Sequence, residues 1–140
     1  VLATELGITD QVRFLGAMFG AEQLRVMRTH QLCVVPSRAC ESFGIVALEA
    51  AACGCVIIAS DCGGLPEAFG PSGEIFPVGD INRLAELVLK FLQHPELQEP
   101  LRESAKTHLR QFTADAVATR YLEALKRVAK VTQSSPSRNP

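Results

Sequence analysis

The stretch LCVVPSRACESFGIVALEAAACGCVIIASDCGG, residues 32–64, decides the fold. It holds two continuous apolar runs, residues 32–36 and 55–60, which are joined by a loop and an Ala-rich segment of helical composition. Because these runs are apolar throughout rather than alternating, they predict strands that are buried on both faces, as in a parallel sheet. A strand, a helix and a second strand in this order indicate a right-handed crossover in an α/β fold.

The segments on either side continue this alternation at first. Before residue 32 we expect a helix at the start of the chain, a short strand over residues 12–16 and a helix over residues 21–30. After residue 64 we expect a short helix, a strand over residues 74–78 and then helices only. The predicted fold class is therefore α/β, with a Rossmann-like parallel sheet that is flanked by helices and followed by C-terminal helices.

Three C-terminal helices are predicted by apolar residues that recur at helical spacing. Asp80 and Thr113 are the expected N-caps of the first and third helices, and Pro95 opens the second. The third helix is expected to end near residue 130, and the polar residues 131–140 to form a disordered tail. The faces expected to point inward comprise Leu84, Leu87, Val88, Phe91 and Leu92 in the first helix, Leu97, Leu101, Ala105 and Leu109 in the second, and Val117, Tyr121, Leu125 and Val128 in the third.

Size and composition indicate one globular domain, over residues 1–130. The 140 residues are 47% hydrophobic and 21% charged, with a formal net charge of -1, and this balance gives no sign of nucleic-acid binding. The apolar runs are too short to cross a membrane. The chain starts without Met and inside a predicted helix, so we expect an N-terminally truncated piece of a longer protein.

The five cysteines are an odd number and lie in apolar contexts, which favours a reducing compartment, the cytoplasm, over a disulfide framework. Cys53, Cys55 and Cys62 are close enough in sequence to suggest a metal site. They lack a second C-x-x-C pair and a nearby His, so small buried packing residues are the favoured interpretation.

Two glutamates eight positions apart, Glu41 and Glu49, are the main candidates for function. Ligands of parallel sheets bind beyond the carboxyl ends of the strands, where the loop with Glu41 lies. Glu49 falls in an apolar helix, where a carboxylate is costly unless it meets an internal partner or faces a polar cleft. The helix start between the two offers free N–H groups for phosphate, although Glu41 could instead only complement the helix dipole. The spacing suits a ligand with hydroxyls at both ends and phosphates between them.

Neighbouring residues add to this candidate site. Ser42 is expected to cap the helix, and Gly44 to leave room for a ligand atom. Gly63 and Gly64 permit a tight turn and close ligand contact after the second strand. Arg38 could reach a phosphate or form an ion pair with Glu41. By contrast, His30, His94 and His108 are scattered, and we expect structural or surface roles for them.

The stretch PSRACESFGIVALEAAACGCVIIASDCGGLPEAFG, residues 36–70, resembles the donor-binding signature of glycosyltransferase family 4, and the resemblance is close over about residues 9–80. One departure is the gap before Glu41, which holds Arg38, Ala39 and Cys40 where many members have two residues; we expect a slight shift of Glu41. The positions that match the family pattern are Pro36, Ser37, Glu41, Phe43, Gly44, Glu49, Gly54, Gly63, Gly64, Pro66 and Glu67.

The resemblance implies the C-terminal half of a GT-B enzyme, a retaining hexosyltransferase of carbohydrate biosynthesis. Glu41 would contact the transferred sugar as the catalytic residue, and Glu49 the ribose of a nucleotide-diphosphate sugar. The implied donor-binding set is Arg38, Glu41, Ser42, Phe43, Gly44, Ile45, Glu49, Gly63 and Gly64. Neither a metal nor a cofactor is implied.

What lies outside the chain also follows from the resemblance. An Arg and a Lys that hold the leaving diphosphate belong upstream of Val1, as does the domain that binds a sugar, lipid or other hydroxyl acceptor. The fragment alone is therefore expected to bind donor weakly and to catalyse little. Two alternatives stay open: a nucleotide-sugar epimerase of the same architecture, and a non-catalytic nucleotide-sugar-binding domain.

Overall fold

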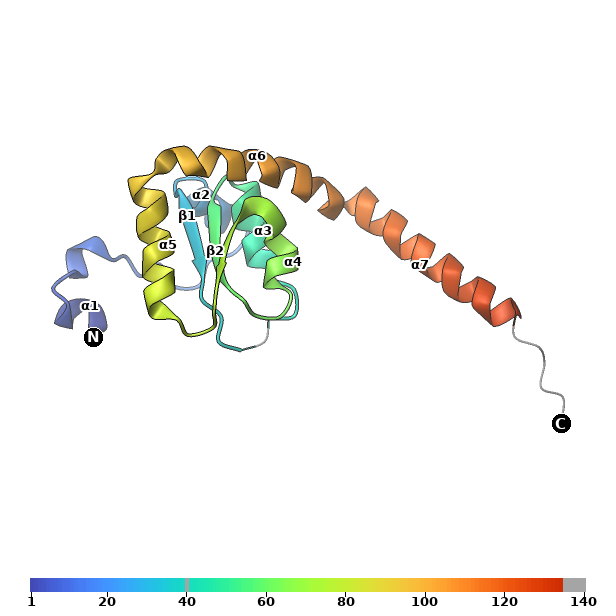
Figure 1. The fold of residues 1–140 in the computed structure, drawn as a ribbon, viewed down its shortest axis with the longest axis horizontal. Coiled ribbons are helices and arrows are strands. Elements are labelled where there is room, and N and C mark those ends of the chain that lie inside the picture. Colours follow the sequence, from blue (N-terminus) through green and yellow to red (C-terminus); the bar gives the residue numbers. More distant parts are fainter. Residues whose placement is uncertain (40, 135–140) are drawn as a thin grey trace.

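A parallel three-stranded sheet forms the centre of the computed structural model, which describes residues 1–39 and 41–134. The strands β1 (Leu32–Val35), β2 (Val56–Ser60) and β3 (Gly73–Phe76) lie in the order β1-β2-β3. Leu32 is in register with Val56, and Ile57 with Gly73. The parallel sheet predicted from the apolar runs is confirmed, and the carboxyl ends of all three strands meet at one edge (Figure 1).

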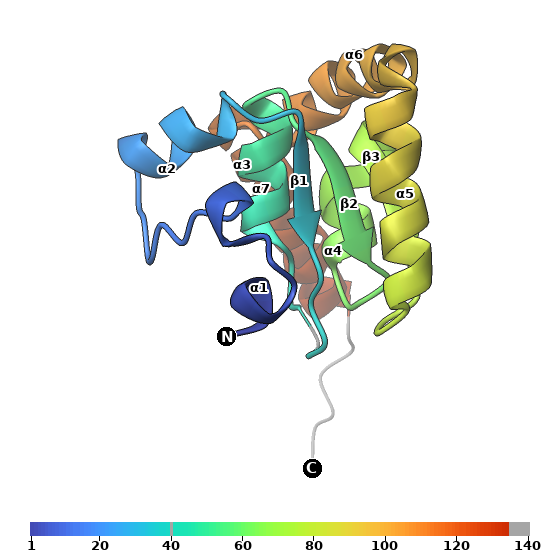
Figure 2. The ribbon, with the colours of Figure 1, turned by 90° about the vertical axis from the view of Figure 1, so that its left-hand side faces the viewer.

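Helices cover both faces of this sheet, so that the body has three layers (Figure 2). One face carries α3 and α4, with α2 beside them, and the other carries α5. Helix α6 crosses the end of the sheet opposite the strands' carboxyl ends (Figure 1). The helices are α1 (Leu2–Glu5), α2 (Ala21–Met27), α3 (Ile45–Ala52), α4 (Leu65–Phe69), α5 (Ile81–Gln93), α6 (Gln98–Leu109) and α7 (Ala114–Ser134), with short 3-10 turns at Thr9–Gln11, Gly70–Ser72, Pro95–Leu97 and Arg110–Phe112.

The central strand β2 divides the core between the two faces. Val56 and Ile58 pack with Leu87 and Phe91 of α5, whereas Ile57 and Ala59 pack with the alanines of α3. All five residues of β2 are buried, as the continuous apolar run predicts. Strand β1 differs because it lies at an edge of the sheet, and Val34 is 40% exposed. The prediction of burial on both faces is therefore wrong for β1.

The strand predicted over residues 12–16 is also wrong. The segment is extended at Val12, but it pairs with no strand in the described part of the chain. Phe14 is 85% exposed. A strand needs a neighbour to accept and donate its backbone hydrogen bonds, and apolar residues alone do not supply one.

The predicted caps and stops of the helices are confirmed in three places. Asp80 caps α5 by accepting a hydrogen bond from Arg83 N at 2.9 Å, and Thr113 Oγ1 accepts from Ala116 N at 3.3 Å. Gly54, with φ +92°, follows the last turn of α3 as its stop. Along α5 the predicted apolar face is covered except at Leu92, which is 56% exposed.

Helix α7 contradicts two predictions. It runs away from the three-layer body (Figure 1), and the predicted inward face is exposed, with Tyr121 at 70% and Leu125 and Val128 at 65%. The reason is geometric: Val117 and Tyr121 line a cavity that they share with Leu48 of α3 and Glu67 of α4, and neither core cluster of the described residues includes an α7 side chain. The helix also continues to Ser134, past the predicted end near residue 130, and residues 135–140 of the predicted tail lie outside the described residues. Within the described ranges, no helix is both long and apolar enough to cross a bilayer.

Candidate functional site

The loop after β1 is held along its length by the last residue of β2 and by the residues that follow it. Ser60 Oγ donates to Ser37 O at 2.8 Å, Cys62 Sγ to Ala39 O at 3.0 Å, and Gly64 N to Glu41 O at 2.8 Å. The donors are residues 60, 62 and 64, and the acceptors are residues 37, 39 and 41. These bonds form a ladder that continues past Val35 and Ala59, the last residues that pair β1 with β2. This ladder fixes the backbone of Glu41 at the carboxyl edge of the sheet. Cys40, inside this loop, lies outside the described residues.

The glycine pair after β2 permits this close approach. A Cβ at Gly64 would lie 2.6 Å from Ser42 O, and one at Gly63 would lie 2.1 Å from Glu41 O. Gly63 also has φ +56°, where a side chain is disfavoured. The predicted tight approach is therefore made to the protein's own backbone, while contact of these glycines with a ligand stays a prediction.

Helix α3 begins at this edge with Gly44 as its N-cap residue. Gly44 has φ +92° and ψ +48°, and its carbonyl accepts the first helical hydrogen bond, from Ala47 N at 3.0 Å. The expected cap by the Ser42 hydroxyl is wrong, since no side chain caps this helix. Where a Cβ of Gly44 would lie, the side chain of Leu65 packs at 2.6 Å. Ile45 is 63% exposed, whereas Gly44 before it is buried, so the helix reaches the surface from Ile45 onward.

Glu49 is half-buried in α3 and has a neutral partner. Gln23 Nε2, from α2, donates to Glu49 Oε2 at 3.0 Å. Within residues 1–39 and 41–134 no ion pair involves Glu41 or Glu49. The internal partner considered for Glu49 is thus a neutral amide, and an ion pair between Arg38 and Glu41 is not formed.

Arg38 and Phe43 point into two different cavities beside the loop. Arg38 lines a small cavity of about 60 Å³ with Asp80, at the start of α5. Phe43 lines a larger one of about 600 Å³ next to α7, where its ring meets Phe112 edge-on at 5.7 Å between centroids. Neither of these two cavities includes Glu41 or Glu49 among its lining residues.

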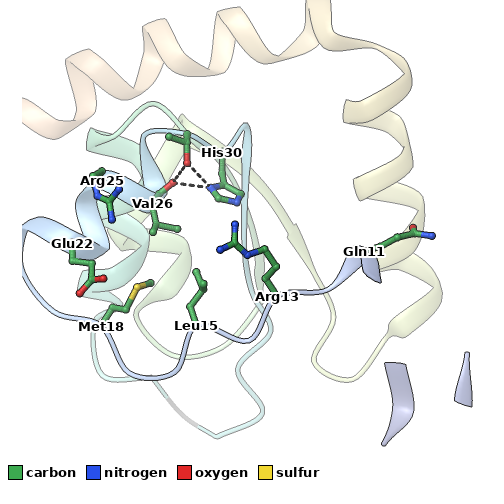
Figure 3. Close-up of a pocket in the computed structure, with 9 residues that line it drawn as sticks. Gln11, Arg13, Leu15, Met18, Glu22, Arg25, Val26 and His30 are labelled. Atoms are coloured by element: carbon green, nitrogen blue, oxygen red, sulfur yellow. Dashed lines mark hydrogen bonds between the residues drawn. The ribbon is translucent and has the colours of Figure 1, made fainter. Parts of the chain in front are cut away.

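A third cavity, of about 510 Å³, lies between α2 and the segment that precedes it (Figure 3). His30 forms its rim, and its Nδ1 lies 2.7 Å from Val26 O at the end of α2. His94 contacts Glu96 and His108 contacts Ala68 O, while structural or surface roles for the three histidines stay a prediction. The cavity is lined by Gln11, Arg13, Leu15, Met18, Glu22, Arg25, Val26, Thr29 and His30.

Three of the cysteines, Cys53, Cys55 and Cys62, donate hydrogen bonds to backbone carbonyl oxygens. Cys55 Sγ donates to Met27 O at 3.1 Å, and burial raises the pKa of the Cys55 thiol to about 11, so it stays protonated. Cys53 and Cys62 also hydrogen-bond to carbonyl oxygens. In the part of the chain that the structure describes, no group of three His, Cys, Asp or Glu side chains could hold a metal ion.

Sequence reasoning missed three side chains of this site. Ser60 and Cys62 hydrogen-bond to the loop after β1. The sequence does hold a sign of this, since Ser60, Cys62 and Gly64 follow one another at every second position, the spacing of residues on one side of a strand. Gln23 carried no signal, since its partner Glu49 is 26 positions away.

The family is established by comparison with known proteins. The family model for glycosyl transferases group 1 matches residues 1–108. The chain belongs to this family. The predicted fold is confirmed by structures of such glycosyltransferases: sucrose-phosphate synthase from Thermosynechococcus elongatus superposes with a TM-score of 0.77 at 32% identity, covering 93% of this chain and 33% of that one. HepE from Anabaena, in complex with UDP, superposes with a TM-score of 0.79 at 27% identity, covering 89% and 35%.

Curated glycosyltransferases show the same partial match. The D-inositol 3-phosphate glycosyltransferase of Saccharomonospora viridis is 39% identical over 130 residues, which are 89% of this chain and 30% of that protein. The enzyme of the same name from Gordonia bronchialis is 36% identical over 99% of this chain and 30% of its own length. The chain thus spans about a third of the length of the curated relatives it matches.

Proposed function

We propose that this chain is the donor-binding domain of a retaining glycosyltransferase, which transfers a hexosyl group from a nucleotide-diphosphate sugar to an acceptor hydroxyl. The observation that carries the proposal is the ladder between the two loops, which holds Glu41 beside the exposed start of α3, with Glu49 further along the same helix. Family membership supports it, and so does the likeness to HepE, whose structure holds UDP.

The donor would lie along the start of α3. The N–H groups of Phe43, Gly44 and Ile45 and the positive end of the helix dipole would bind the phosphates. Glu41 would accept hydrogen bonds from hydroxyls of the transferred sugar, and Glu49 from the ribose. Ser42, Gly63 and Gly64 would line the same edge. Arg38, which forms no ion pair with Glu41, would be free to reach a phosphate.

In the reaction, an acceptor oxygen would form a bond to the anomeric carbon as the bond to the diphosphate breaks, and the diphosphate would leave with the electron pair and accept the acceptor's proton. Retention requires the acceptor to approach from the face that the diphosphate leaves. Catalysis would come from positioning and from stabilisation of charge on the diphosphate. No metal or cofactor enters this proposal.

A second domain is part of the proposal. Before residue 82 the chain's cations are Arg13, Arg25, Arg28 and Arg38, and of these only Arg38 lies in the loop of the candidate site. A diphosphate beside two carboxylates needs more compensation than one arginine, so we assign an Arg, a Lys and the acceptor site to the rest of a longer protein. The free thiols of Cys33, Cys53, Cys55 and Cys62 support a cytoplasmic location.

Calorimetry of the full-length protein with UDP, GDP and ADP tests the donor role. We expect one of them to bind, and Glu49→Ala to weaken it roughly ten-fold, the order expected when hydrogen bonds to a charged group are lost. Glu86→Ala, on the exposed side of α5, is the matched control and should leave binding unchanged. Absence of binding by all three nucleotides would contradict the proposal.

Reaction with donor alone and with acceptor separates the proposed transferase from an epimerase, which needs no acceptor. NMR of the product's anomeric signal reports retention or inversion. Glu41→Gln should lower kcat by at least roughly 100-fold if Glu41 acts at the reacting sugar. An unchanged kcat would remove Glu41 from the catalytic role.

A further inference from the structure

Two half-buried side chains from different helices meet beside the candidate site. Gln23 of α2 donates through Nε2 to Oε2 of Glu49 in α3, at 3.0 Å. Neither residue takes part in the loop ladder, and Gln23 lies outside the segment that carries the donor-binding pattern. The contact is therefore a separate feature that reaches the site from α2.

The chemistry of the pair suits the positioning of a carboxylate. The hydrogen bond engages one of the two oxygens of Glu49, and each carboxylate oxygen can accept more than one bond. An amide donor is neutral, so it orients the carboxylate without cancelling its charge. A free glutamate has three side-chain torsions to order when a ligand binds, and ordering them beforehand lowers that entropic cost.

We propose that Gln23 is a positioning residue of the donor site: it holds Glu49 Oε2 so that Oε1 is presented to the ribose hydroxyls of the donor. This rests on the proposed function, since it takes Glu49 as the ribose-binding residue. Gln23 itself need not touch the donor.

The alternative is that the hydrogen bond only ties α2 to α3. Two other contacts already hold α2 to the end of α3 and the start of β2. Cys55 Sγ donates to Met27 O at 3.1 Å, and Cys53 Sγ to Leu24 O at 3.7 Å. These two bonds hold α2 in place without Gln23. We therefore expect the hydrogen bond from Gln23 to act mainly by orienting the carboxylate of Glu49.

The test compares ribose with a sugar that lacks its hydroxyls. The dissociation constants of UDP, ADP and GDP, and of their 2′,3′-dideoxy forms, are measured by calorimetry on the full-length protein. The variants are Gln23→Met, which keeps length but lacks the donor, Gln23→Glu, which replaces the donor by an acceptor, and Glu49→Ala. Gln93→Met, at the exposed end of α5, is the control.

We expect the preference for the ribose form to fall roughly three- to ten-fold in Gln23→Met, the range of one lost hydrogen bond, and further in Gln23→Glu. The dissociation constant of the dideoxy form should stay unchanged in both. If Gln23 has only a structural role, the dissociation constants of the ribose and dideoxy forms should rise together or both stay unchanged. Either result would overturn the inference. Thermal denaturation without ligand identifies a Gln23 variant that has lost its fold. In that case the binding constants of the other Gln23 variant test the inference.

The two proposals fail differently. If Glu49→Ala abolishes the ribose preference and both Gln23 variants keep it, the positioning role is wrong and the donor site stands. If the wild-type protein binds none of the three nucleoside diphosphates, the proposed function is overturned, and this inference with it.

Discussion

Helices α5 and α7 have similar sequence patterns and different surroundings. Both carry apolar residues three and four positions apart, yet α5 buries Leu87 and Phe91 to within 1% exposure, whereas α7 leaves Tyr121 70% and Leu125 65% exposed. Helix α5 lies against β2 and β3, while α7 extends away from the body (Figure 1). An apolar stripe thus predicts that a face can be covered, but the element that covers it must come from elsewhere.

Two apolar segments, residues 12–16 and 32–35, differ in the same way, because one has a neighbouring strand and the other does not. Residues 32–35 form β1 because β2 lies beside them and accepts their pairing. Residues 12–16 have a similar apolar content, but they pair with no strand among the described residues. Covered and uncovered elements should therefore respond very differently to equivalent substitutions.

The largest difference is expected between two aromatic residues. Phe91→Ala in α5 should destabilise the 140-residue chain by about 3–5 kcal/mol, because it leaves a cavity in the core. Tyr121→Ala in α7 should change the free energy of unfolding by less than about 0.5 kcal/mol. Urea denaturation monitored by circular dichroism measures both. Equal losses would show that α7 is covered in solution.

The second comparison concerns two glycines. Gly64→Ala places a Cβ 2.6 Å from Ser42 O and should cost about 1–3 kcal/mol, because backbone atoms must move apart. Gly16→Ala meets no atom within 4 Å, and the exposed segment can relax its φ of +70°. Its expected cost is below about 1 kcal/mol.

Chemical denaturation of these two variants is to be paired with nucleotide calorimetry on the full-length protein. Gly64→Ala should weaken binding as well as stability, since the displaced backbone carries Ser42 and Phe43. Normal binding in a destabilised Gly64→Ala variant would separate the loop ladder from the donor site.

The smallest comparison concerns the helix caps. Asp80→Ala should cost about 1 kcal/mol, since it removes the acceptor of Arg83 N at the start of a packed helix. Thr113→Ala removes the longer bond from Ala116 N, and α7 can fray without exposing core, so we expect a few tenths of a kcal/mol at most. The melting temperatures of the two variants show which cap contributes more to stability. A larger decrease for Thr113→Ala than for Asp80→Ala would contradict this prediction.

Much of the fold was predictable because its signals are local. The buried run at residues 56–60, the cap at Asp80 and the stop at Gly54 each depend on neighbours within one turn or one strand. Three of the wrong predictions, namely the strand over residues 12–16, the burial of both faces of β1 and the inward face of α7, each needed a distant partner. For the site, the loop and helix that carry Glu41 and Glu49 were predictable, but the Ser42 cap was not formed.

The sequence by itself determined the alternation of strands and helices from residue 32 onward and placed two carboxylates around a helix start, because hydrophobic periodicity acts over a few residues. Only the tertiary structure decided that Ser60 reaches Ser37, 23 positions away, and that Gln23 reaches Glu49, 26 positions away. Such contacts depend on where the chain returns to itself, and no local pattern encodes that distance.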